Sequence, residues 1–183
     1  MRLQKTYSLT LIAIGAAIIA VLSPFTLPIG TVPVTLQTLA VGLVATVLKA
    51  RETFFAVLLY LILGSIGLPV FAGGSAGVMT FFSPTGGYLL AFLFGGTLIS
   101  FGLQRVSYRP LFAFVVNILG HLLMLFLGAM WLKLITHTSL KTALILGFTP
   151  FIVVEIVKAI IVTILGLALI RALSHTHQYF TKM

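Results

Sequence analysis

Six long apolar segments, joined by short connections, account for most of this sequence. They cover residues 7–23, 33–48, 53–68, 85–103, 110–132 and 147–171. A helix needs about 20 apolar residues to cross the hydrocarbon core of a bilayer, and each segment meets or approaches that length. Only 7% of the residues are charged, whereas soluble domains contain about 25%. The sequence therefore predicts an all-α membrane protein, a six-transmembrane-helix bundle that forms a single domain over residues 1–183.

The basic residues stand singly near the ends of these segments and predict the orientation. Eight of them lie before the first segment, in the second and fourth connections, or after the last segment, and two lie in the fifth connection. Because Lys and Arg concentrate on the cytoplasmic side of membrane proteins, we expect both termini in the cytoplasm. The net charge of +9 forms no basic stripe, which argues against a nucleic-acid partner.

The first apolar segment has the outline of a signal peptide, because Arg2 and Lys5 precede it. No Ala-x-Ala cleavage pattern follows, so we expect it to be retained as the first span. Within it, Ala13 and Ala17 stand four residues apart, a spacing that lets two membrane helices approach closely. The partner of this small-residue face is either another helix of the bundle or another protein.

The third connection, "GLPVFAGGSAGVMTFFSPTGGY", contains six glycines, two prolines and no charged residue. Irregular backbone at membrane depth survives only where it is buried in protein or lines a cavity. We therefore expect this segment to fold over the outer end of the bundle as a lid. Phe71 is a candidate ligand contact, and Gly73 and Gly74 allow the sharp turns and close approach that only glycine permits. The alternative is a packed plug without a ligand.

The sixth segment contains one of the two acidic residues of the chain, Glu155, and a basic residue three positions later, Lys158. Residues three apart share a helix face, and a charge at the bilayer centre costs about 2.5–3.5 kcal/mol. The pair is either an ion pair that locks helix packing or a polar anchor for a ligand. Polar groups expected at similar depth are Thr35, Gln37, Thr38 and Tyr88. The other acid, Glu52, is interpreted as a solvated surface charge.

The remaining polar residues inside the spans suggest packing rather than chemistry. Asn117 and His121 share a face of the fifth segment, and we expect them to form hydrogen bonds between helices. One buried carboxylate and one histidine inside the spans are too few for a metal site. The chain has no cysteine, no nucleophile–base pair and no phosphate-binding loop, so no catalytic residue and no cofactor is expected.

Three motifs together resemble the BioY family, the substrate-binding S component of energy-coupling factor (ECF) biotin transporters. They are "PVTLQTLAV" at 33–41, "GLPVFAGGSAG" at 67–77 and "SPTGGYL" at 83–89. The Ala13–Ala17 pair and the acid–lysine pair of the sixth segment are also similar to family features. Two departures stand out: Val154 and Glu155 replace a Gly-Asp pair that is common in relatives, and Gly73 and Gly74 lie where some relatives carry an amide.

The resemblance implies that this chain captures extracellular biotin at the plasma membrane of a prokaryotic-type cell. It implies a transmembrane coupling protein, docked at Ala13 and Ala17, and two ATP-binding-cassette ATPases as partners, which would hydrolyse the ATP. Glu155, Lys158 and Gln37 would bind the ureido ring, while Phe71 and Tyr88 would contact the apolar parts. Thr85 or glycine backbone N–H groups would receive the ligand carboxylate.

Two other functions fit the same sequence. One is an S component for a different vitamin. The other is a stand-alone proton-coupled carrier in which Glu155 and Lys158 relay the proton.

Overall fold

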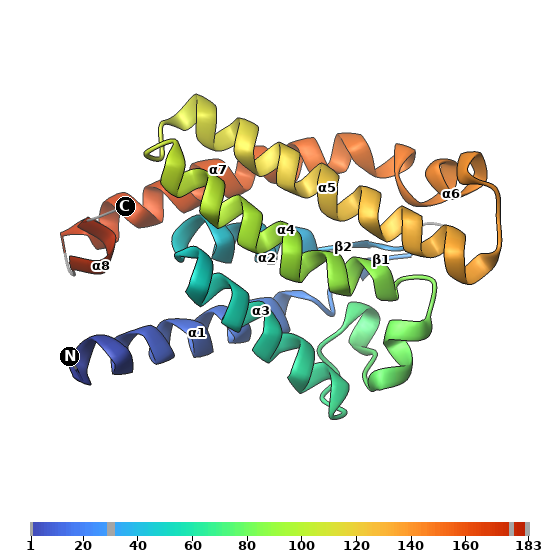
Figure 1. The fold of residues 1–183 in the computed structure, drawn as a ribbon, viewed down its shortest axis with the longest axis horizontal. Coiled ribbons are helices and arrows are strands. Elements are labelled where there is room, and N and C mark those ends of the chain that lie inside the picture. The colour runs from blue at the N-terminus through green and yellow to red at the C-terminus, as the bar shows by residue number, and fades with distance from the viewer. Residues whose placement is uncertain (1, 29–31, 176–177, 182–183) are drawn as a thin grey trace.

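The computed structural model describes residues 2–28, 32–175 and 178–181, and α-helices make up most of them. The helices are α1 (Arg2–Leu22), α2 (Gln37–Val47), α3 (Ala50–Ser65), α4 (Gly86–Arg105), α5 (Pro110–Thr136), α6 (Leu140–Gly147), α7 (Ile152–Ser174) and α8 (Gln178–Thr181). They form an elongated bundle with the N- and C-terminal ends at the same end of the molecule (Figure 1). That end, with α8 and the first turns of α1, is called the terminal end below.

The remaining elements are short and lie in the connections. They are the strands β1 (Thr26–Leu27) and β2 (Val34–Thr35), and the 3₁₀ helices η1 (Ala72–Gly74), η2 (Val78–Phe82) and η3 (Thr149–Phe151). The two strands pair antiparallel, with Thr26 opposite Thr35. The strands lie between α1 and α2, and η3 lies between α6 and α7, away from the terminal end (Figure 1). The other two, η1 and η2, belong to the segment 67–88, which is called the lid segment below.

The six predicted spans correspond to α1, α2, α3, α4, α5 and α7, but their lengths differ from expectation. Among the described residues, four apolar stretches are long enough to cross a bilayer: Lys5–Leu22, Gly86–Arg105, Pro110–Thr136 and Leu140–Ser174. The predicted span 33–48 is wrong at its start, because helix α2 begins only at Gln37 and has 11 residues. Its first residues instead form β2, which pairs with β1 and cannot be helical. At about 1.5 Å per residue, α2 is much shorter than the hydrocarbon core.

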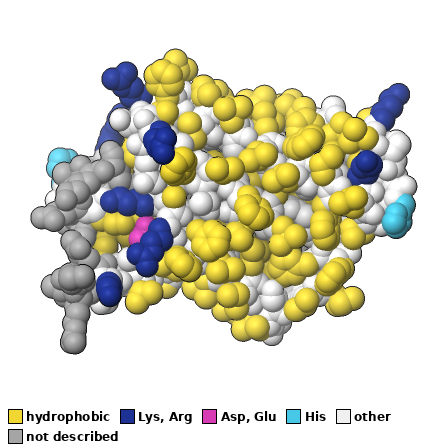
Figure 2. Space-filling view, in the orientation of Figure 1, with side chains coloured by type: hydrophobic (Ala, Val, Ile, Leu, Met, Phe, Trp, Pro, Cys, Tyr) yellow, Lys and Arg dark blue, Asp and Glu magenta, His cyan; other side chains and the backbone are white. Residues whose placement is uncertain are grey.

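The surface of the bundle matches a lipid environment. Large apolar side chains are exposed along the helices, among them Leu9, Leu119 and Ile164. In the space-filling view, hydrophobic side chains cover the middle of the molecule, and the Lys and Arg side chains visible on this face gather at its two ends (Figure 2). A protein with this surface is a multi-pass membrane protein, since apolar side chains in the middle meet lipid and charged ones meet water.

Glycines allow α4 and α5 to pack in close contact along their length. A Cβ atom added at Gly95 would overlap Met124, one at Gly120 would overlap Ile99, and one at Gly128 would overlap the Tyr88 ring. Each glycine therefore accommodates a large side chain from the facing helix. Small residues of this kind are the usual means by which membrane helices approach each other.

The terminal end contains a polar cluster that the sequence did not predict. Glu52 is 7% exposed rather than solvated. Ser8 Oγ donates to its Oε1 at 2.6 Å, and the Tyr179 hydroxyl donates to its Oε2 at 3.3 Å. Burial raises the pKa of Tyr179 above its ordinary value, so the hydroxyl stays protonated and remains a donor. The interpretation of Glu52 as a surface charge was wrong, because Ser8 and Tyr179 cover it, and these lie 44 and 127 positions from it in the sequence.

We expect Gly120→Leu to destabilise the protein by about 1–3 kcal/mol, because the new side chain must displace Ile99 from a filled interface. Thermal unfolding in detergent, followed by circular dichroism, measures the effect. Val115→Leu is the matched control, since Val115 lies on the same helix with 41% of its surface exposed. Equal melting temperatures for the two variants would contradict the proposed packing role of Gly120.

Candidate functional site

A cavity of about 200 Å³ lies inside the bundle beneath the segment 67–88. Its walls come from β2, the 3₁₀ helices η1, η2 and η3, the first turns of α2, α4 and α7, and the middle of α5. The predicted site residues that line it are Thr35, Gln37, Phe71, Thr85, Tyr88, Glu155 and Lys158. A cavity of this kind does not fit the expectation of a solid plug.

Glu155 and Lys158 form a hydrogen-bonded pair in the cavity wall. Lys158 Nζ donates to Glu155 Oε1 at 2.7 Å and to Thr38 Oγ1 at 2.8 Å. The Thr38 hydroxyl in turn donates to the same Oε1 at 2.9 Å, which closes a ring of three bonds. Both charged side chains are nearly buried, Glu155 with 3% and Lys158 with 8% of the side-chain surface exposed. The pair is therefore neutralised internally, as a charge inside a membrane protein must be.

The second oxygen of Glu155 is bound from another helix. His121 Nδ1, on α5, lies 2.8 Å from Glu155 Oε2. The hydrogen bond between helices that we predicted for His121 is confirmed, but its partner, Glu155, was not predicted. The depths could have suggested it: His121 is 12 residues from Arg109 and Glu155 is 16 residues from Arg171. Counted from these basic ends, their depths differ by about one helical turn.

Asn117, one turn before His121 on α5, forms its predicted bonds between helices. It donates through Nδ2 to Thr163 Oγ1 on α7 at 3.2 Å. It also accepts from Thr46 Oγ1 on α2 at 3.2 Å. Asn117 thus ties three helices together next to the cavity network, and it is not itself a cavity residue.

Two predicted ligand contacts are held by other protein groups. The Gln37 amide donates to the Tyr60 hydroxyl at 2.8 Å and accepts from Thr35 Oγ1 at 3.2 Å. The Tyr88 hydroxyl donates to the backbone carbonyl of Gly147 at 2.6 Å. The hydroxyl of Tyr88 therefore fastens α4 to the end of α6, while the rest of the side chain contributes to the wall of the cavity.

The lid segment is anchored by one aromatic side chain. Phe71 is fully buried, with its ring over Gly64 and edge-to-face with the rings of Tyr60 and Phe81. Gly73 and Gly74 follow with positive φ angles of 63° and 76°, a backbone region that favours glycine. They do not line the cavity; they let the chain turn back so that the Phe71 N–H donates to the carbonyl of Ser75 at 3.0 Å.

Several lining residues were missing from the predicted site. Ser75 and Thr80 add hydroxyl groups from the lid, and Phe92 and Phe151 add apolar wall. Phe151 lies only about one helical turn before Glu155, which was predicted as a site residue. Its apolar side chain has no feature that would distinguish a cavity wall from a helix interface.

The structure also gives the position of the two alanines of the first segment. Ala13 and Ala17 are exposed on α1, whereas Gly15 and Ala16 are buried against the bundle. A Cβ atom at Gly15 would come within 3.0 Å of Ala56 on α3. Helix α1 therefore packs against the bundle through its Gly15–Ala16 face. The Ala13–Ala17 face is left exposed by the other described helices.

The family model of the BioY family matches residues 1–175. This chain belongs to the BioY family. The resemblance inferred from the three motifs is thereby confirmed.

The relatives and a solved structure all carry biotin in their names, and each matches most of this chain. "Biotin transporter BioY2" of Lactococcus lactis subsp. cremoris (strain MG1363) is 69% identical, with all of both chains covered. "Probable biotin transporter BioY" of Pyrococcus horikoshii is 37% identical over 85% of this chain and 91% of the relative. The fold matches a crystal structure of the S-component for biotin from an ECF-type ABC transporter. The TM-score is 0.87 and the identity 32%, over 93% of this chain and 94% of that one.

We expect Lys158→Met to destabilise the protein by about 3–5 kcal/mol, because Glu155 then keeps a buried charge without its counter-ion. The double variant Glu155→Gln/Lys158→Met should recover much of that loss, since it buries no net charge. Thermal unfolding of the ligand-free proteins in detergent compares them. If the double variant were the less stable of the two, the pair would not be charged in the folded state.

Proposed function

We propose that this protein is the biotin-binding S component of an ECF-type ABC importer in the plasma membrane. The names of the relatives and the matched S-component structure support biotin as the ligand. The observation that carries the proposal is the Glu155–Lys158 pair, which borders a cavity in a mostly apolar bundle and still has hydrogen-bonding capacity left.

That remaining capacity matches a ureido group. An ammonium has three N–H donors, and Lys158 uses two of them on Glu155 and Thr38. The third is available for the ureido carbonyl oxygen. A carboxylate has about four acceptor positions, of which Glu155 uses three, so one is available for a ureido N–H. The cyclic urea of biotin thus presents the acceptor and donor that this pair lacks.

The rest of the cavity suits the other parts of biotin. Phe71, Phe92 and Phe151 give apolar wall for the sulfur ring and the aliphatic chain. Thr85 and Ser75 lie on the lid side, where their hydroxyl groups can bind the ligand carboxylate, and Gln37 adds an amide held by Tyr60. Gly73 and Gly74 shape the lid through their positive φ angles. Ligand sites are typically apolar with a few fixed polar groups.

The exposed face of α1 is the proposed dock for the coupling protein. Ala13 and Ala17 present small side chains to the outside of the bundle, and such residues let another membrane helix approach closely. The transmembrane coupling protein would bring two ABC ATPases, which hydrolyse ATP. With both termini in the cytoplasm, as the basic residues indicate, the cavity lies in the outer half of the membrane.

We expect the purified protein to bind biotin at one site and Glu155→Gln to weaken this binding by roughly 10- to 100-fold. The reason is that a hydrogen bond to a charged group contributes about 1.5–3 kcal/mol. Titration calorimetry in detergent measures the dissociation constant. Glu52→Gln is the matched control, because Glu52 is the only other acid of the chain and bonds to Ser8 and Tyr179 away from the cavity.

Mass spectrometry of ligands extracted from the freshly purified protein identifies what the cavity holds. We expect biotin in wild type and its loss in Glu155→Gln. A different vitamin in the extract, or an equal effect of the Glu52 and Glu155 variants on the Kd, would refute the proposed ligand or the proposed site.

We expect Ala13→Leu/Ala17→Leu to abolish copurification with the coupling protein and ATPases and to reduce cellular biotin uptake, because the added side chains hold the partner helix away. The biotin Kd of the isolated protein should stay unchanged. Ala168→Leu is the control, since Ala168 is an exposed alanine on α7. Full uptake and intact assembly in the double variant would exclude this face as the dock.

A further inference from the structure

His121 is buried beside the cavity but contributes nothing to its wall. It is 0% exposed and is not a lining residue. Its Nδ1 atom lies 2.8 Å from Glu155 Oε2, on the opposite side of the carboxylate from Thr38 and Lys158, which bind Oε1. The imidazole therefore reaches the ligand only through Glu155.

The other ring nitrogen of His121, Nε2, is buried and has no hydrogen-bond partner in the part of the chain that the structure describes. It lies against the backbone of Gly42 on α2, where even an added Cβ atom would overlap it. A neutral imidazole has one donor nitrogen and one acceptor nitrogen. Since a carboxylate needs the donor and an N–H at Nε2 would be buried without an acceptor, the proton belongs on Nδ1.

We infer that His121 is a positioning residue which, as the neutral Nδ1–H tautomer, fixes the Glu155 carboxylate for ligand binding. This inference rests on the proposed binding of biotin at Glu155. A glutamate side chain has three rotatable bonds, and ordering it costs free energy on binding. With Oε2 held by His121 and Oε1 by Thr38 and Lys158, that ordering is complete before the ligand arrives, which improves affinity.

The neutral state of the ring also preserves the charge balance of the site. The charges of Glu155 and Lys158 cancel each other. In the described network, no Asp, Glu, Lys, Arg or His residue other than these two and His121 takes part. A neutral His121 leaves the pair free to present one donor and one acceptor. The absence of a side chain at Gly42 is what allows the imidazole to fit in this position.

Three variants separate a positioning role from simple packing. His121→Leu removes the donor, His121→Asn keeps an N–H near the place of Nδ1, and Asn117→Leu removes a buried polar group one turn away that bonds Thr46 and Thr163 instead. We expect His121→Leu to weaken biotin binding roughly 10- to 100-fold, the range of a hydrogen bond to a charged group. His121→Asn should restore most of the affinity, and Asn117→Leu should lower the melting temperature while leaving the Kd near wild type.

A double-mutant cycle with Glu155→Gln tests whether His121 acts through Glu155. If it does, His121→Leu should have little further effect on the Kd in the Glu155→Gln background, because coupled residues are not additive. Equal losses in both backgrounds, or no rescue by His121→Asn, would overturn the inference.

Nitrogen-15 NMR of the ligand-free protein decides the tautomer independently of biotin. The signals of His121, identified by their absence in His121→Asn, should show a protonated Nδ1 and a bare Nε2. A proton on Nε2, or on both nitrogens, would overturn the positioning role. A wild-type protein that binds no biotin would instead refute the proposed function, and the tautomer would still be determined.

Discussion

A carboxylate and an ammonium in an apolar bundle can persist only if they neutralise each other and if most of their other hydrogen-bonding positions are filled. Glu155 and Lys158, both on α7, meet this constraint by bonding to each other, to Thr38 on α2 and to His121 on α5. The requirement therefore fixes how α2, α5 and α7 pack around one point. What it leaves open, one donor and one acceptor at the wall of the cavity, is the chemistry on which the proposed function depends.

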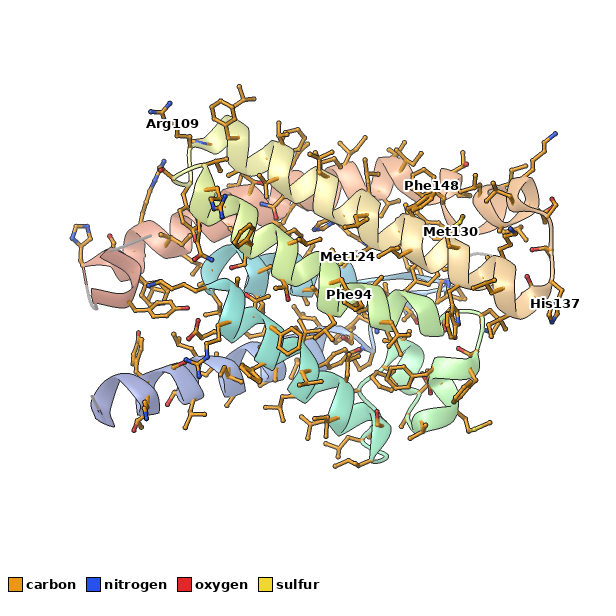
Figure 3. The ribbon with its side chains drawn as sticks, in the orientation of Figure 1. Phe94, Arg109, Met124, Met130, His137 and Phe148 are labelled. Atoms are coloured by element: carbon orange, nitrogen blue, oxygen red, sulfur yellow. The ribbon has the colours of Figure 1, made fainter. Side chains whose placement is uncertain are left out.

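The surroundings of the pair are built for close contact. Gly42 makes room for His121, and the glycines of α4 and α5 make room for Tyr88, Ile99 and Met124. In the stick view, the labelled Met124 of α5 extends into the interior of the bundle, while Arg109 and His137 mark the two opposite ends of the same helix (Figure 3). Rigid packing of this sort keeps the polar groups in place when the cavity is empty.

The sequence predicted those features that depend on local pattern. Apolar length gave the helices, and the rarity of charge singled out Glu155 and Lys158. The glycines and prolines of 67–88 predicted an irregular segment at the end of the bundle. The features that were missed depend on contacts between distant residues. The pairing of β2 with β1 shortens α2, Ser8 and Tyr179 bury Glu52, and His121 joins Glu155 from another helix. No periodicity or composition encodes such pairings.

The cluster at the terminal end has a practical consequence for handling this protein. Tyr179 lies in α8, beyond the long helix α7, yet its hydroxyl group donates to Glu52 and accepts from the backbone N–H of Lys49. The last helix is thus part of the folded body rather than a loose tail. An affinity tag or fluorescent fusion joined directly after α8 would lie next to Glu52, which also bonds Ser8 on α1. A spacer keeps the added domain away from these contacts.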